Sequence, residues 1–183
     1  MKDLTIRTAT KSDYDAIQSL WKKVIEKAFE QEHFDSDKIN PQKELEFKMD
    51  QLNQAFSSEH STFFVAYDNG RLIGTIAYGT PPNRGIMRRT DGELKDHYEL
   101  GSLYIDPALQ KKGYGKHLLV HALKHLRSRG IEEVCFDSIY EVSKNIWRKI
   151  FGEPRYQLKA SWGDFYHMIW VKPVKAALED LDA

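Results

Sequence analysis

The sequence has 183 residues, the length of one domain that buries its own core, with 41% hydrophobic and 30% charged residues. Lysine plus arginine and aspartate plus glutamate both number 27, so the net charge of +0 excludes a protein drawn as a whole to nucleic acid or to a membrane surface. The single cysteine excludes intrachain disulfides, and the sequence shows neither a signal peptide nor a membrane-spanning run, so we expect a cytoplasmic protein.

The first half of the chain predicts a strand, two amphipathic helices and a hairpin. A strand is expected over residues 4–8, followed by a capping box formed by Ser12 and Asp15. Asn40-Pro41 is expected to begin the second helix. The apolar residues at helical spacing in the two helices are Ile17, Leu20, Trp21, Val24, Ile25 and Ala28, then Leu45, Met49, Leu52 and Phe56. Two β-rich runs then flank Asn69-Gly70, a pair typical of a tight hairpin turn.

The second half alternates strands and helices. We expect a loop over residues 80–96, a strand over 98–106, a helix that ends at Gly130, and a strand over 132–140. A short helix follows at Val142–Phe151, then a hairpin of "YQLKA" and "FYHMIWVK", and a tail that is either helical or disordered. This order predicts an α/β protein, a mixed sheet with helices on its faces, in one domain whose core spans about residues 4–172 with a tail at 173–183.

The stretch "QKKGYG", residues 110–115, lies between a predicted strand and a predicted helix. Glycines let the backbone approach a ligand, and the first amides of a helix are unpaired and lie at the positive end of its dipole. Lys111, Lys112 and Lys116 add charge, and no acidic residue occurs between Asp106 and Glu132. The pattern therefore fits an anion site, although a solvated structural loop has the same spacing. It is not a Walker loop, because Gly115-Lys116 is followed by histidine.

The segment "LGSLYIDPALQKKGYGKHLLVHAL", residues 100–123, resembles the acyl-CoA-binding motif of the GNAT N-acetyltransferases. Two further segments, "IRTATKSDYDAIQSL" and "FFVAYDNGRLIGTIAY", are similar to the first strand and helix and to the central hairpin of that family. The resemblance implies a GNAT-like fold, a central, mostly antiparallel sheet flanked by helices. It also implies acetyl-CoA as cosubstrate and no metal.

The resemblance assigns roles to the residues of this segment. Main-chain amides would hold the pyrophosphate of the coenzyme, at Gln110, Lys111, Lys112, Gly113, Tyr114, Gly115 and Lys116. Backbone groups of Leu103, Tyr104 and Ile105 would pair with the pantetheine arm like an added strand, and an N–H of that strand would stabilise the oxyanion. Asn145 resembles the coenzyme-contacting asparagine of the family, although it lies closer to Gly152 than expected.

Glu99 is the candidate catalytic base. It lies eleven positions before Gln110, a spacing similar to that of the glutamate base in the histone-acetyltransferase branch of the family. Burial would raise the pKa of its carboxyl towards a useful value. The alternative is a strand-end carboxylate exposed to water.

The proton donor to the departing thiolate has no clear candidate. Many family members carry a tyrosine on the helix after the next strand, and this chain has Trp147 or Arg148 at that place. Tyr140 and Tyr156 lie nearby in sequence, but nothing distinguishes either of them.

The resemblance leads us to expect direct acetyl transfer to a primary amine of a small molecule. A protein N-terminus or lysine, or a non-catalytic acyl-CoA-binding module, are the alternatives. His117, His121 and His125 repeat at helical spacing, but no carboxylate or thiolate near them completes a metal site. Cys135 is expected to be a buried, inert thiol. Alternation along "FYHMIWVK" leaves one face for the core and the other for an acceptor pocket or a homodimer seam.

Overall fold

The structure, a computed structural model, describes residues 3–32, 40–159 and 166–182. The polar stretch at 33–39 and the turn of the closing hairpin at 160–165, with Phe165, lie outside the described residues. The chain forms two compact units. The first comprises Met1–Ala77 and Ser102–Ala122, and the second comprises Tyr78–Gly101 and Leu123–Ala183.

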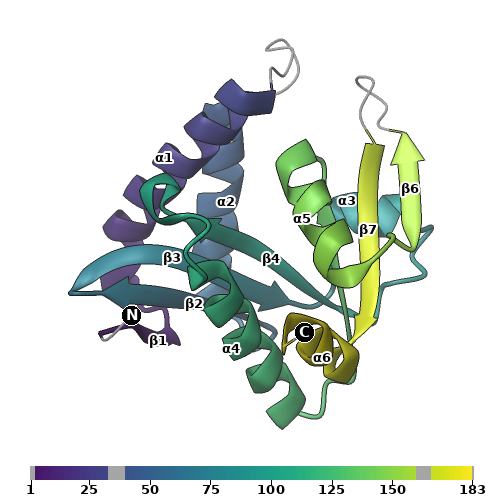
Figure 1. The fold of residues 1–183 in the computed structure, drawn as a ribbon. Helices are drawn as coiled ribbons and strands as arrows, with labels where there is room; N and C mark the ends of the chain where they lie inside the picture. The colour runs from purple at the N-terminus through teal and green to yellow at the C-terminus, as the bar shows by residue number, and fades with distance from the viewer. Residues whose placement is uncertain (1–2, 33–39, 160–165, 183) are drawn as a thin grey trace. The chain divides into compact units, whose positions relative to one another are not determined.

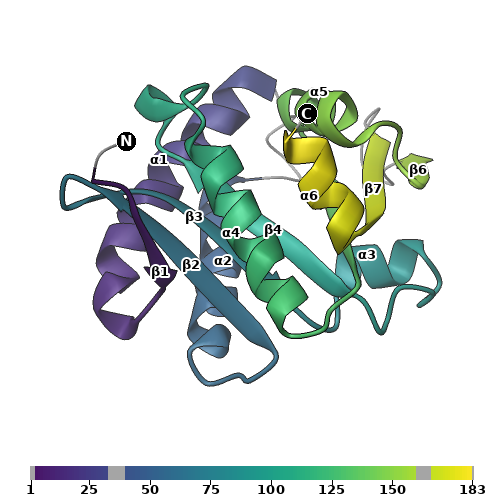
Figure 2. The same cartoon turned by 60° about the horizontal axis from the view of Figure 1, so that its bottom comes forward.

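The first unit contains a hairpin with helices on both of its faces. Its elements are β1 (Thr5–Thr8), η1 (Lys11–Asp13), α1 (Tyr14–Glu32), α2 (Pro41–Ala55), β2 (Ser61–Asp68), most of β3 (Arg71–Gly79), the second half of β4 (Tyr98–Ile105), η2 (Pro107–Leu109) and the start of α4 (Tyr114–Ser128). Phe63 and Val65 of β2 pack with the buried residues of α1 and α2. Phe64, on the opposite face of the strand, meets His121 of α4 edge to face at 4.7 Å. The helices α1 and α2 therefore cover one face of β2, and α4 covers the other (Figure 2).

Of three local predictions in this unit, the helix cap at Asn40 and the turn at Asn69-Gly70 are confirmed, and the capping box of Ser12 and Asp15 is wrong. Asn40 Oδ1 accepts a hydrogen bond from Gln42 N at 2.7 Å and begins α2, as expected. Asn69 and Gly70 both have positive φ angles, which the tight turn of the β2–β3 hairpin requires. The predicted box of Ser12 and Asp15 does not form. The Thr10 amide instead donates to Asp13 Oδ2 at 2.8 Å, so the box begins two residues earlier.

The second unit is built around β5 (Glu133–Ser138). Its other elements are α3 (Arg84–Arg89), the first half of β4, the end of α4, α5 (Glu141–Phe151), β6 (Tyr156–Lys159), β7 (Tyr166–Pro173) and α6 (Val174–Asp182). Ile86 of α3 packs on the face of the sheet that carries Cys135 and Ile169, whereas Phe136 stacks on Trp170 on the other face. Phe136 also contacts aromatic rings of α5, so α3 and α5 cover opposite faces (Figure 1).

The expectation of a loop over residues 80–96 is wrong for Arg84–Arg89, which form α3. Asn83 caps this helix, because its Oδ1 accepts hydrogen bonds from Gly85 N at 2.7 Å and Ile86 N at 3.1 Å. The tail forms α6 and buries Leu178 and Leu181.

The strands hydrogen-bond in the order β1-β2-β3-β4-β5-β7-β6, and β4 belongs to both units. β5 pairs in parallel with β4 and antiparallel with β7, and β1–β2 and β6–β7 are antiparallel. This is the mixed, mostly antiparallel sheet that the sequence predicts. Over the described parts of the chain, no helix has the length and apolar character needed to cross a membrane.

Candidate active site

The segment between β4 and α4 is anchored at its beginning by Asp106. This buried carboxylate accepts hydrogen bonds from Lys23 Nζ at 2.7 Å, from Ala108 N at 3.0 Å and from the Arg71 guanidinium. Burial alone would favour the neutral acid, but the hydrogen bond from Lys23, the amide of Ala108 and the two positive charges keep the pKa of Asp106 below its ordinary value. The carboxylate thus ties the end of β4 to α1 and to the β2–β3 hairpin.

The turn that follows is open to solvent. Gln110, Lys111, Lys112 and Gly113 are exposed, and Lys111 and Gly113 have φ angles of +62° and +88°. The first main-chain hydrogen bond back into the turn runs from His117 N to Gly113 O at 3.2 Å. The amides that precede His117 at the head of α4 therefore have no intrahelical acceptor. With the exposed Lys116, the turn combines unpaired donors and positive charge, which suits a phosphate group.

Tyr114, within this turn, has its side chain turned inward. Its hydroxyl donates to Asp68 Oδ2 at 2.7 Å, and the hydrogen bond to this carboxylate, with burial, raises the pKa of Tyr114. The side chain thus joins the first turn of α4 to the end of β2. The role of the Tyr114 main-chain amide in binding the coenzyme stays a prediction.

β4 carries a backbone irregularity next to the predicted pantetheine residues. Its parallel pairing with β5 covers Tyr98 and Glu99, and Ser102 then has a φ angle of +50°, which is unusual for a non-glycine residue in a strand. The bend is held from within the first unit: Trp21 Nε1 donates to Thr75 Oγ1, which donates to Ser102 O, both at 2.9 Å. Leu103, Tyr104 and Ile105 follow this bend.

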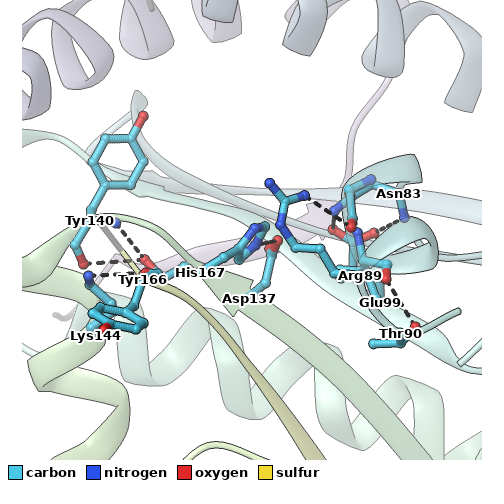
Figure 3. Close-up of polar contacts among 12 residues, drawn as sticks. Asn83, Arg89, Thr90, Glu99, Asp137, Tyr140, Lys144, Tyr166 and His167 are labelled. Atoms are coloured by element: carbon cyan, nitrogen blue, oxygen red, sulfur yellow. Dashed lines mark hydrogen bonds and ion pairs between the residues drawn. The ribbon is translucent and has the colours of Figure 1, made fainter. Parts of the chain in front are cut away.

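Glu99 lies in the second unit and is half-buried. Its two carboxylate oxygens accept hydrogen bonds from Asn83, one from the main-chain N–H at 2.6 Å and one from the side-chain amide at 2.8 Å (Figure 3). The alternative of a strand-end carboxylate exposed to water leaves out these two hydrogen bonds. The carboxylate is held rigidly, and its role as a base stays a prediction.

A second polar pair, which the sequence did not suggest, lies in the same unit. The imidazole of His167 on β7 pairs through Nε2 with Asp137 of β5, and the His167 side chain is only 8% exposed (Figure 3). The two residues are thirty positions apart, so only the register of β5 on β7 brings them together. No local pattern could have revealed this pair.

The remaining candidates, for coenzyme binding and for the proton donor to the thiolate, lie on or near α5. Asn145 is exposed on this helix. Trp147 contacts Phe136 and Phe151, and Arg148 pairs with Glu153, so neither is placed as a proton donor. Burial raises the pKa of Tyr156, which makes this phenol a weaker acid. The neighbouring Lys144 is fully buried, pairs with Glu141 and donates to Tyr166 O at 3.2 Å.

The three histidines of α4 have separate surroundings. His117 Nδ1 lies 2.9 Å from Gly113 O, while His121 packs on Phe64 and His125 on Tyr78. Burial, followed by the charge of Arg129, lowers the pKa of His125. Within residues 3–32, 40–159 and 166–182, no group of three or more histidine, cysteine or acidic side chains is arranged to hold a metal ion.

The fold has many solved counterparts. PaiA N-acetyltransferase from Thermoplasma acidophilum, in complex with coenzyme A, superposes with a TM-score of 0.68 at 17% identity over 92% of this chain and 98% of that one. The ribosomal-protein-S18-alanine N-acetyltransferase from Escherichia coli gives 0.60 at 16% identity over 93% and 94%. YncA from Salmonella typhimurium, with its cofactor acetyl-CoA, gives 0.62 at 17% identity over 94% of both chains. At these identities the likeness shows the fold.

Sequence comparison supplies the family. No curated protein matches the chain significantly. The sequence profile of the acetyltransferase (GNAT) family matches residues 21–152, more than half of the chain, and this span contains the glycine turn and Glu99. The enzyme class that goes with this match is N-acetyltransferase. The chain belongs to the acetyltransferase (GNAT) family.

Proposed function

We propose that this enzyme transfers an acetyl group from acetyl-CoA directly to a primary amine of a small molecule. The observation that carries the proposal is the exposed turn of residues 110–116, where unpaired amides and three lysines meet at the head of α4. The two structural counterparts that hold coenzyme A or acetyl-CoA support this choice of donor.

The turn and the strand before it would divide the binding of the donor between them. The amides of residues 110–116 bind the pyrophosphate, and Lys111, Lys112 and Lys116 add charge around it. The backbone of Leu103–Ile105, beyond the bend at Ser102, offers hydrogen bonds to the pantetheine amides. An N–H of this strand polarises the thioester carbonyl and stabilises the oxyanion that forms on attack. Asn145, exposed on α5, contributes a side-chain amide to the coenzyme.

In this proposal Glu99 binds the amino group of the acceptor. An aliphatic ammonium titrates near 10.4, so a base must take a proton before the nitrogen can attack. A carboxylate carries lone pairs on both oxygens, and that of Glu99 is oriented by two hydrogen bonds from Asn83. It can therefore accept a hydrogen bond from the ammonium, directly or through a water molecule.

A small acceptor is favoured because the chain has a net charge of +0 and offers no overall attraction to an acidic or basic polymer. A protein acceptor is the second candidate, since one structural counterpart is named for a ribosomal-protein alanine. A non-catalytic acyl-CoA-binding module is the third, because the helix tyrosine of the family is replaced by Trp147 or Arg148.

The test begins with calorimetry of the purified protein against coenzyme A. Micromolar binding that is weakened at least tenfold in a Lys111→Ala/Lys112→Ala/Lys116→Ala variant is the expected result. The protein is then mixed with acetyl-CoA and a panel of polyamines, amino acids, aminoglycosides and lysine peptides, and products are identified by mass spectrometry. Acetylation of a small amine supports the proposal, acetylation of peptides alone favours the second candidate, and binding without any product favours the third. Failure to bind coenzyme A would overturn the proposed function.

A further inference from the structure

We infer that His167, held by Asp137, accepts the proton of the acceptor amine during acetyl transfer. The inference rests on the proposed function and adds a catalytic base to it. His167 lies in the second unit, on β7, outside the segments that resemble the GNAT motif.

The hydrogen bonds of the ring leave one nitrogen available. Nε2 of His167 pairs with Asp137 Oδ2, so in the neutral ring this nitrogen carries the proton and donates it to the carboxylate. Nδ1 is then an acceptor. It is buried and has no hydrogen-bond partner among the described residues. A buried polar atom without a partner is unfavourable, so such an atom calls for a ligand or a bound water.

In a core position both ring nitrogens are ordinarily satisfied by protein groups. His97 shares the arrangement of His167, because its Nε2 pairs with Glu133 and its Nδ1 is also buried without a partner among the described residues. His167 differs in its deeper burial, with a side chain 8% exposed against 21% for His97. Here one nitrogen is fixed by a carboxylate and the other is left with a free lone pair, which is the arrangement that orients an imidazole as a general base. The carboxylate also stabilises the positive charge that the ring gains when Nδ1 takes up a proton.

The strand register places this pair on the same face of the sheet as Glu99. Glu99 of β4 pairs with Cys135 of β5, and Asp137 lies two residues further along β5 on the same face. Asp137 is opposite Ile169 of β7, and His167 lies two residues from Ile169, again on that face. Glu99, Asp137 and His167 therefore form one polar group on a single sheet surface, with neighbouring positions on β5 spaced by about 7 Å.

Among the ionisable groups discussed on this surface, the imidazole of His167 is the best placed to accept a proton. Glu99 already accepts two hydrogen bonds from Asn83. Cys135 stays a neutral thiol, because burial, followed by the charge of Glu99, raises its pKa. The pKa of Tyr156 on β6 is raised as well, so it stays a neutral phenol. Arg89 of α3, which donates to Gly85 O at 3.1 Å, is drawn beside these residues in Figure 3. Arg155 adds a second positive charge, 5.5 Å from the centre of the Tyr156 ring.

The step balances without a further reagent. Nδ1 of His167 takes one proton from the acceptor nitrogen as that nitrogen forms its bond to the acetyl carbon. The bond between that carbon and sulfur breaks, and the electron pair leaves with the thiolate. The second proton of the nitrogen passes to the departing thiolate, and the imidazolium releases its own proton to solvent. From an ammonium acceptor the products are therefore the acetamide, the free thiol and one proton. Glu99 has a complementary task, since it holds the incoming ammonium by a hydrogen bond.

The test compares His167→Gln and Asp137→Asn with His97→Gln. His97 is a matched control because it also pairs with a carboxylate of β5, Glu133, at 2.9 Å. With an amine found in the panel, kcat/KM is measured from pH 5 to 9, and coenzyme A affinity is measured by calorimetry. We expect His167→Gln to lower kcat by at least 100-fold, within the range that general bases contribute, and to abolish the acidic limb of the profile. Its coenzyme A affinity should stay within threefold of the wild type.

Asp137→Asn should lower kcat about tenfold, because the ring loses the carboxylate that fixes its tautomer and orientation. His97→Gln should leave the profile unchanged. A His167→Gln enzyme with wild-type kcat and an unchanged limb would overturn the inference alone. If that variant does not fold, Asp137→Asn decides, and a wild-type kcat in this variant overturns the inference. A wild-type protein that binds coenzyme A but acetylates nothing overturns the proposed function, and with it the role of His167.

Discussion

Glu99 and Asn83 form a two-point contact that joins a strand to a helix cap. Glu99 receives the main-chain N–H and the side-chain amide of Asn83, while Asn83 Oδ1 accepts from Gly85 N and Ile86 N at the start of α3. One carboxylate thus fixes the residue that begins the helix covering this face of the second unit. The same contact fixes the orientation of the carboxylate itself, and this has a measurable consequence.

Glu99→Gln is expected to lose about 1–2 kcal/mol of unfolding free energy, because the neutral amide has only one acceptor oxygen for the two N–H donors of Asn83. It should also lower kcat at least tenfold if Glu99 holds the acceptor. Urea unfolding and steady-state kinetics check the two effects. Asn83→Ala is the matched control: it weakens the same contact but keeps the charge, so a similar loss of stability with a smaller loss of kcat is expected. An equal loss of kcat in both variants would assign Glu99 to structure alone.

Gly113→Ala should weaken coenzyme A binding about tenfold. Its φ angle of +88° disfavours a side chain, so alanine would shift the backbone of the turn and the amides that it presents. Gly130→Ala, at the C-terminal end of the same helix, is the control, because its φ angle of +76° carries a similar conformational cost of about 1 kcal/mol. Calorimetry should show reduced affinity for the first variant only. Equal affinities would remove the turn from the coenzyme site.

Gly74→Ala is expected to destabilise the first unit by about 2–3 kcal/mol. A Cβ there would lie 2.6 Å from Ile105 Cδ1, 2.9 Å from Leu118 Cδ1 and 2.9 Å from Tyr104 O, and the main-chain oxygen cannot move aside cheaply. Gly115→Ala, where the nearest atom would be Ile105 Cγ1 at 3.7 Å, should leave the thermal midpoint unchanged. Thermal unfolding followed by circular dichroism checks both. A Gly74→Ala midpoint equal to that of the wild type would contradict this packing.

Asp13 should make the stability of the protein sensitive to acid. Its buried carboxylate accepts from Arg7 at 2.7 and 2.8 Å and from Tyr67 at 2.7 Å. The hydrogen bonds from Arg7, more than the opposing effect of burial, keep the pKa of Asp13 far below its ordinary value of 3.8. A carboxyl with a lowered folded pKa stabilises the protein above that ordinary value, and the contribution is lost as pH falls below it.

We therefore expect Asp13→Asn to cost about 2 kcal/mol at pH 7, moderated because Arg7 is partly exposed, and the difference from the wild type to shrink between pH 4 and 2. Urea unfolding across this pH range measures it. Asp15→Asn, at an exposed carboxylate two residues on, should cost less than 1 kcal/mol at pH 7. A pH-independent difference for Asp13→Asn would show that the Arg7 pair does not hold the charge.

The sequence was informative wherever a signal is local. Asn40-Pro41, Asn69-Gly70 and Gly130 each impose their geometry within a few residues. The apolar stripes of α1, α2 and α4 are buried except for Ala28 and Phe56, which are half-buried. The sequence did not predict α3, because its six residues include Gly85 and two prolines precede its cap. The stability of this helix depends on Asn83 and the buried Ile86. Pairs made by strand register, above all His167 with Asp137, carry no local signal. Tyr114 is similar, since its partner Asp68 is distant in sequence.

Cys135 has a practical consequence for all of these measurements. It is the single cysteine of the chain, its side chain is fully buried, and burial raises its pKa, so the native protein presents no reactive sulfur. An aromatic disulfide reagent added during turnover would therefore react only with the thiol of the coenzyme A released from acetyl-CoA, and its absorbance would report that release. In a control reaction without acetyl-CoA, a slow increase in absorbance would report the reaction of the dye with Cys135 when the β5 region opens. The rate of this increase would measure local opening of that region in each variant.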